Sequence, residues 1–181
     1  MSVHSSHRAC DGRHAPAVAD RCYFKIKLRG QAIGLPVDCV KTVFHVEALT
    51  PVPLAPPEIA GLANLRGRIV TMLRLDRCLW LDAAVPSDES RLAVGVQHNG
   101  EDYALLIDAT EDVVTVRDDA RMECPTHIDP RLRDLLSGCY REDLGFLSIL
   151  DLGALLRRVN RSSEQTPGAS RRGVSLKGAG K

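Results

Sequence analysis

Short apolar runs separated by turn signals recur through the middle of this chain, and they restrict its possible folds more than any other feature. The runs cover residues 23–28, 31–37, 41–46, 68–75, 91–98, 102–108, 112–116 and 145–150. Their length and their content of β-branched residues are typical of strands. About eight to ten short strands favour small closed or sandwiched units, because one open meander would leave long edges exposed. We therefore expect a mainly β protein built as two small barrels that share a core.

Two dipeptides between these runs have the chemistry of tight hairpin turns. Asn99-Gly100 separates two apolar runs, and both residue types accept the positive φ of a type I′ turn. Arg29-Gly30 occupies the same place between the first two runs. The sequence therefore predicts two antiparallel hairpins at these positions.

Three segments interrupt the β pattern and are predicted to form short helices, at 57–65, 130–136 and 151–159. The last has the clearest signal, with Asp151 as a candidate N-cap. Its apolar residues follow the spacing of one buried helical face, and they are Leu152, Leu155, Leu156 and Val159. We expect this helix to pack onto the barrels.

The two ends of the chain differ in composition from the body. Residues 1–20 are rich in Ser, His, Ala and Arg, and residues 161–181 contain almost no large apolar side chain, so both ends are predicted to be disordered. The formal charge of the whole chain is +1, but its positive charge is concentrated in the tail. No apolar segment suits a signal peptide or a membrane span. We therefore expect a cytoplasmic protein.

Cysteine and histidine spacing gives little support for a metal or redox site. The six cysteines, at 10, 22, 39, 78, 124 and 139, include no Cys-x-x-Cys pair, so six free thiols are expected, with Cys124 as the most exposed. His4, His7, Cys10 and His14 could gather around zinc or nickel, but no second ligand pair follows them. We expect no metal and no cofactor.

The segment 61–70 reads Gly-Leu-Ala-Asn-Leu-Arg-Gly-Arg-Ile-Val, a polar corner that leads into a β-branched run. It contains no nucleophile with a base and no phosphate-binding glycine loop. Arg66 offers five donors in a rigid fork suited to a carboxylate, and Gly67 permits a tight turn. This corner is typical of a docking surface, so the chain is predicted to be an adaptor and not an enzyme.

Four sequence blocks carry a resemblance to a known family. They are residues 34–43, 61–70, 103–108 and 146–151, and residues 50–53 lead through a proline-rich link into the second block. In the order of these blocks, the body of the chain resembles the CheW-like domain of bacterial chemotaxis coupling proteins. The resemblance implies one CheW-like domain over residues 21–160, with two five-stranded SH3-like β-barrels, short helices and a C-terminal helix. It also implies a protein without catalytic activity or cofactor.

The resemblance further implies a role in signal transduction. Members of the family connect a CheA-type histidine kinase to methyl-accepting chemoreceptors, and they reach the membrane only through the receptor array. A groove between the barrels would take the helical tip of the receptor. The candidate receptor-binding residues are Val40, Thr42, Val43, Asn64, Arg66, Gly67, Leu92, Ala104 and Ile107. For Val40, Val43 and Ile107 the competing interpretation is that they are core residues.

Several positions depart from the family pattern. Thr42 replaces a glutamate that usually pairs with the corner arginine, which leaves Arg66 to pair with Asp38, Glu47 or an acid on a partner. Arg74 and Asp76 exchange the usual order of acid and base, and they would keep a local ion pair of reversed polarity if they face each other or a common neighbour. These changes fit either an adaptor for a variant receptor or a stand-alone regulator that competes for the kinase in a non-standard array.

A third interpretation, a β-barrel that binds nucleic acid, is much weaker. It would need a basic face with exposed aromatic residues, but the chain is only 4% aromatic and its body is slightly acidic. Trp80, the single tryptophan, is interpreted as a packing anchor or as a hot spot for a partner.

Overall fold

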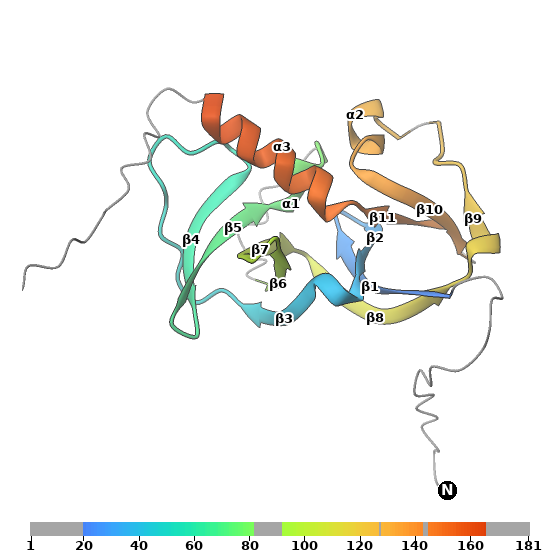
Figure 1. Cartoon of the computed structure of the whole chain (residues 1–181), viewed down its shortest axis with the longest axis horizontal. Helices are drawn as coiled ribbons and strands as arrows, with labels where there is room; N and C mark the ends of the chain where they lie inside the picture. The colour runs from blue at the N-terminus through green and yellow to red at the C-terminus, as the bar shows by residue number, and fades with distance from the viewer. Residues whose placement is uncertain (1–19, 82–91, 127, 143–144, 166–181) are drawn as a thin grey trace, which may run out of the picture.

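The computed structural model describes residues 20–81, 92–126, 128–142 and 145–165. Most of these residues lie in strands, which form two sheets. The first sheet has the order β8-β1-β2-β11-β10-β9, and the second has the order β3-β6-β7-β5-β4. Figure 1 shows the second sheet on the left and the first on the right.

The strands of the first sheet are β1 Arg21–Leu28, β2 Gln31–Pro36, β8 Ala109–Val116, β9 Arg121–Met122, β10 Leu136–Glu142 and β11 Gly145–Leu150. Those of the second sheet are β3 Val40–His45, β4 Ile59–Leu65, β5 Arg68–Arg74, β6 Leu92–His98 and β7 Glu101–Ile107. The helices are α1 Leu75–Cys78, α2 Pro130–Arg133 and α3 Leu152–Gln165, with 3₁₀ turns η1 Val37–Cys39 and η2 Asp118–Ala120.

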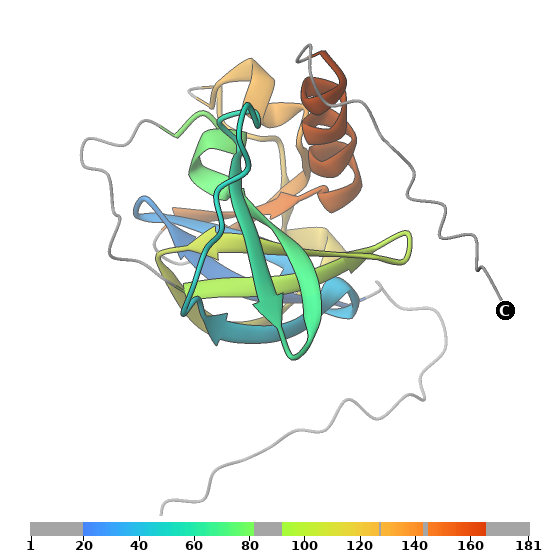
Figure 2. The same ribbon diagram turned by 90° about the vertical axis from the view of Figure 1, so that its left-hand side faces the viewer.

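The chain passes from the first sheet to the second and back again. After β2 it crosses through η1 into β3, and after β7 it returns through Asp108 directly into β8. Each sheet also contains one parallel pair, β2 with β11 and β5 with β7. In Figure 2 all three helices lie in the upper part of the molecule, and most of the strands lie below them. The expected mainly β fold is confirmed, and the short strand β9 extends the first sheet to six strands.

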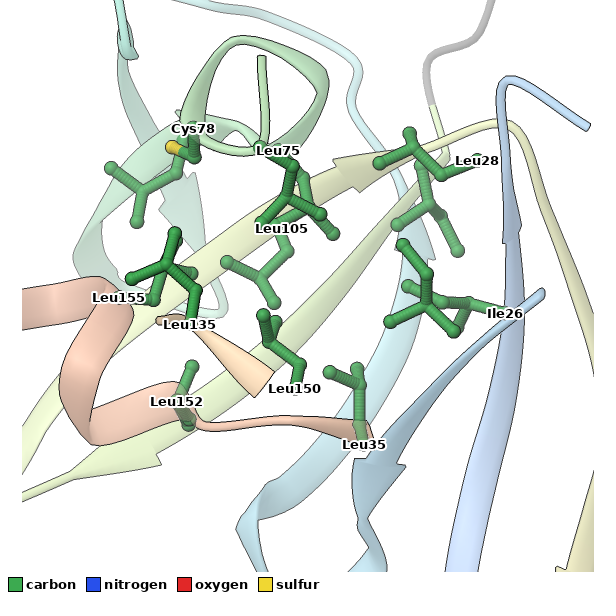
Figure 3. Packing of buried hydrophobic residues seen from close by; sticks show 14 of the residues in the cluster. Ile26, Leu28, Leu35, Leu75, Cys78, Leu105, Leu135, Leu150, Leu152 and Leu155 are labelled. Atoms are coloured by element: carbon green, nitrogen blue, oxygen red, sulfur yellow. The ribbon is translucent and has the colours of Figure 1, made fainter. Parts of the chain in front are cut away.

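One hydrophobic core joins the two sheets and the helices. It includes Ile26 and Leu35 from the first sheet, Leu105 from β7, Leu75 from α1 and Leu155 from α3, each at most 1% exposed. Figure 3 shows these side chains directed into a common interior. The predicted stripe of α3 is confirmed, because Leu152, Leu155, Leu156 and Val159 are all buried in this core. Since both sheets contribute to it, the two units are packed as one body.

Positive backbone angles confirm the two hairpin turns expected from the sequence. Arg29 and Gly30 have φ of 51° and 75°, and Asn99 and Gly100 have φ of 51° and 82°. Positive φ at both central residues is the requirement of a type I′ turn, whose twist matches that of the flanking strands. These turns join β1 to β2 and β6 to β7.

The helix expected at 57–65 is wrong, because residues 59–65 form strand β4, which pairs antiparallel with β5. Gly61 explains the error: its φ of 148° is not helical, and a Cβ there would lie 2.4 Å from the carbonyl oxygen of Thr50. The close approach of Gly61 to Thr50 is not visible in the apolar periodicity of the local sequence, so the pattern did not predict a strand there. The helix expected at 130–136 is also shorter, since α2 ends at Arg133 and β10 begins at Leu136.

The predicted boundary of the tail at residue 161 is also wrong, because α3 continues to Gln165. Val159 is the last core residue of α3, and the residues that extend the helix beyond it are polar. The prediction followed the buried apolar stripe and therefore ended the helix at Val159. The expected disorder at 1–19 and 166–181 lies outside the described residues. None of the helices in the described ranges is long and apolar enough to cross a membrane.

The expectation of six free thiols is wrong for two cysteines. Cys124 and Cys139 form a disulfide, with their Cα atoms 5.4 Å apart. Pairing of β9 with β10 places Met122 opposite Cys139 and so brings Cys124 next to it, which the sequence spacing does not reveal. Cys22, Cys39 and Cys78 are free.

Burial raises the pKa of the Cys78 thiol to about 12, so it remains protonated and behaves as a small apolar side chain.

Truncation of a shared core residue should destabilise the whole domain. We expect Leu155→Ala to lower the free energy of unfolding by about 2–5 kcal/mol, because a cavity replaces the lost side chain. Val113, which is 54% exposed on β8, provides the control. Val113→Ala should change stability by about 0.5 kcal/mol or less. Denaturant titration measures both, and two separate unfolding transitions in the Leu155 variant would contradict a shared core.

Candidate functional site

The corner identified in the sequence is the turn between β4 and β5. Arg66 and Gly67 have φ of 53° and 84°, so both central residues are in the left-handed region. The side chain of Asn64 accepts a hydrogen bond from the backbone nitrogen of Gly67 at 2.8 Å. Asn64 and Gly67 therefore shape the turn, and Arg66 is exposed at its tip.

A pocket of about 340 Å³ lies beside this turn, on the second sheet. Residues from β3, β6, β7 and the β4–β5 hairpin line it: Lys41, Thr42, Leu65, Arg66, Arg68, Val70, Gly95, Val96, Gln97, Asp102 and Tyr103. Thr42 pairs with Gly95 across β3 and β6, and a Cβ on Gly95 would lie 2.9 Å from the Thr42 methyl carbon. The glycine thus allows Thr42 to lie close to the floor of the pocket. Thr42 and Arg66, two of the predicted site residues, meet here.

The side chain of Arg66 forms no ion pair with any residue in the described ranges. The expected intramolecular partners, Asp38 and Glu47, do not pair with it. Arg66 also has a left-handed backbone conformation, which costs a residue other than glycine about 1–2 kcal/mol of stability. A cation that is exposed, unpaired and held at some cost in stability is suited to a carboxylate on a partner.

The remaining charges of the pocket are mostly basic. Arg68 forms an ion pair with Asp102 at 3.0 Å, and Gln97 donates a hydrogen bond to the other oxygen of the same carboxylate at 3.1 Å. Asp102 is therefore already occupied, and Lys41 has no ion pair among the described residues. Burial, followed by its hydrogen bond to Glu101, raises the pKa of Tyr103, which keeps the phenol neutral. The pocket thus presents the uncompensated charges of Arg66 and Lys41.

An exposed apolar residue lies next to the corner, and the sequence analysis missed it. Ile69 on β5 is 65% exposed, whereas its neighbour Val70 is 2% exposed. Alternate residues of a strand face opposite sides, so the adjacent pair Ile69-Val70 was the available signal that one of them lies on the surface. Arg68, Gln97 and Asp102 were also missed, because only the folded sheet brings them to the pocket.

Other predicted site residues do not reach this pocket. Ala104 and Ile107 are buried in the two larger core clusters, at 0% and 1% exposure. Val40 and Leu92 are half-buried and pack against the shared core. Val43 is 39% exposed on β3 but is not among the lining residues. The apolar side chains of Val40, Leu92, Ala104 and Ile107 are therefore explained by their packing in the core, without a role in binding.

The expected pair between Arg74 and Asp76 is not formed. Asp76 instead binds Arg29, with 2.8 Å between the guanidinium and the carboxylate, and both side chains are less than one fifth exposed. The backbone nitrogen of Arg29 also donates to Asp108 at 2.6 Å. These bonds connect the β1–β2 turn to α1 and to the β7–β8 crossover. Asp76 thus joins the two halves of the fold.

Comparisons with known proteins agree on one family. A family model described as CheW-like domain matches residues 23–160. The chemotaxis protein CheW of Bacillus subtilis is 24% identical over 136 residues, which cover 75% of this chain and 86% of that protein. The chemotaxis protein CheW of Treponema pallidum is 27% identical over 132 residues, which cover 71% and 78%.

A similar fold occurs in the crystal structure of the scaffolding protein TtCheW from Thermoanaerobacter tengcongensis. The TM-score is 0.65 at 24% sequence identity, and the alignment covers 76% of this chain and 92% of that chain. The likeness therefore extends over both sheets of the described fold.

The left-handed turn makes a direct prediction about stability. Gly67→Ala should lower the free energy of unfolding by about 1 kcal/mol, because alanine is strained at a φ of 84° even though no atom blocks its Cβ. Arg66→Gly should leave stability unchanged or raise it slightly, since glycine removes the same strain. Urea denaturation compares the two, and an Arg66→Gly variant less stable than Gly67→Ala would show that the Arg66 side chain holds the turn.

Proposed function

Because this chain belongs to the CheW-like domain family, we propose that it is an adaptor that couples methyl-accepting chemoreceptors to a CheA-type histidine kinase. Members of the family are scaffolding proteins and not enzymes. The proposed signal is therefore a change in protein contacts, with no chemical step carried out by this chain.

The observation that carries the proposal is Arg66 at the tip of the β4–β5 turn, which forms no ion pair with the residues that the structure describes. It borders the 340 Å³ pocket together with Lys41 and the half-buried Leu65. An apolar residue beside two cations suits an amphipathic helix that carries acidic residues next to its apolar stripe. The helical tip of a chemoreceptor would supply such a surface.

Thr42 gives a reason to keep a second candidate function. Without a glutamate at this position, Arg66 is available to a partner in the free protein, and its specificity can differ from that of other family members. The second candidate is a stand-alone regulator that binds the kinase without receptor and competes with an ordinary adaptor. The proposed location in both cases is cytoplasmic, with contact to the membrane only through receptor arrays.

Reversal of charge at Arg66 tests the proposed receptor site. Arg66→Glu should weaken binding to receptor by about tenfold or more, corresponding to about 1.4 kcal/mol. Its melting temperature should stay within a few degrees, because an exposed charge contributes about 0–1 kcal/mol to folding. Co-sedimentation with receptor-containing membranes measures the binding.

Arg141→Glu on β10 is the matched control, since Arg141 is also exposed but lies on the first sheet. Its binding should equal that of the unmodified chain. Equal binding by the Arg66 variant would refute the docking role, and a large loss of melting temperature would assign Arg66 to the fold instead.

Kinase assays separate the two candidate functions. Purified chain added to the kinase together with receptor should raise receptor-coupled autophosphorylation if the chain is an adaptor. A competitor should lower that activity when an ordinary adaptor is present. Phosphate incorporation into the kinase, with and without receptor, is the measurement, and no effect in either arm would contradict both.

A further inference from the structure

Trp80 contacts two guanidinium groups at the helical end of the molecule. The Cζ atom of Arg158 on α3 is 3.8 Å from the centroid of the indole ring, and the Cζ atom of Arg131 on α2 is 4.8 Å from it. Both distances are within the range of cation–π attraction. Two helices that are distant in sequence thus meet at the single tryptophan of the chain.

A second pocket, of about 270 Å³, opens at this tryptophan between α2 and α3. Its lining residues are Trp80, Arg131, Asp134, Leu135, Ala154, Arg157, Arg158 and Arg161. They include four arginines and one carboxylate. The elements that form it lie together at the top of Figure 1, whereas the β4–β5 turn that carries Arg66 lies at the bottom. Figure 2 shows the same separation.

Two of the four arginines are already neutralised within the fold. Arg158 binds Glu58 at 3.1 Å and donates to the backbone carbonyl of Cys78 at 2.7 Å. Arg131 binds Asp129 at 2.8 Å. Arg158 is mostly buried, with its side chain 20% exposed, so its function is to hold Trp80 and to anchor α3.

The other two arginines, Arg157 and Arg161, are exposed and form no ion pair with residues in the described ranges. They are four residues apart on α3, so their Cβ atoms are about 5–6 Å apart on one face of the helix. The two cations therefore start one turn apart along the helix axis. This spacing suits two carboxylates of one peptide better than a single phosphate group.

The backbone at Trp80 supports a functional interpretation of this surface. Its φ of 52° is in the left-handed region, where a bulky side chain is an outlier. Such residues cost about 1–3 kcal/mol and cluster at binding sites. Tryptophan and arginine are also the residues most enriched among interface hot spots.

We propose that this Trp80 pocket is a docking site for an acidic peptide segment of a partner protein. Two carboxylates of the segment form ion pairs with Arg157 and Arg161, and an apolar side chain between them packs against Trp80 and Ala154. The pocket shares no lining residue with the pocket beside Arg66. This inference is therefore independent of the proposed receptor contact, and either one can fail alone.

The single tryptophan allows a direct test, because its fluorescence comes only from this pocket. Titration of the full chain with a short glutamate-rich peptide at low salt should change the Trp80 emission in a saturable way. The Arg157→Gln and Arg161→Gln double variant should bind about tenfold more weakly, the loss expected for two partly exposed charge pairs. A peptide of the same length with glutamine in place of glutamate should give no change.

Arg117→Gln is the control variant, since Arg117 is exposed but lies beyond the end of β8 on the first sheet. It should bind the glutamate-rich peptide as the unmodified chain does. An equal loss of affinity in this variant and in the Arg157/Arg161 double variant would show that the peptide responds only to the net charge of the protein, and would contradict a specific site. A saturable response to pyrophosphate but not to the peptide would overturn the proposal in favour of a phosphate ligand. No response to the peptide in fluorescence or calorimetry would also overturn it.

Discussion

The shared hydrophobic core is the constraint on which the rest of the structure depends. Neither sheet encloses all its apolar side chains by itself: Ile26 and Leu35 of the first sheet and Leu105 of the second are buried against each other and against α3. Burial of apolar surface is the main favourable term in folding. The relative position of the two sheets is therefore set by the same contacts that stabilise each of them, and the Arg29–Asp76 ion pair adds a polar link between them.

A fixed core gives the exposed features fixed positions. Strand β5 runs from the Arg66 turn to Leu73, and Leu75 of α1 follows it; both leucines are fully buried in the shared core. The turn therefore has a fixed position, and the arginine at its tip has no ion pair within the described part of the chain. At the helical end, Arg158 anchors α3 to Glu58 and Cys78 while it contacts Trp80. The two pockets with mostly basic charged side chains are therefore held on one rigid body.

Prediction from the sequence succeeded where one element carries its own pattern. The type I′ turns at Arg29-Gly30 and Asn99-Gly100 and the apolar stripe of α3 are local signals, and the structure confirms them. Strand β4 was missed because its conformation depends on Gly61 passing close to Thr50. The disulfide was missed because Cys124 and Cys139 are brought together by the pairing of β9 with β10.

The sequence by itself determined the mainly β class, the turn at Arg66 and the motif order that relates the chain to the CheW-like family. These depend on residue periodicity, turn chemistry and the order of blocks, all of which are local along the chain. Only the tertiary structure decided which apolar candidates are core, that Arg66 has no internal partner in the described part of the chain, and that Trp80 contacts arginines of α2 and α3. Each of these depends on contacts between residues distant in sequence, which form only when the two sheets and the helices pack together.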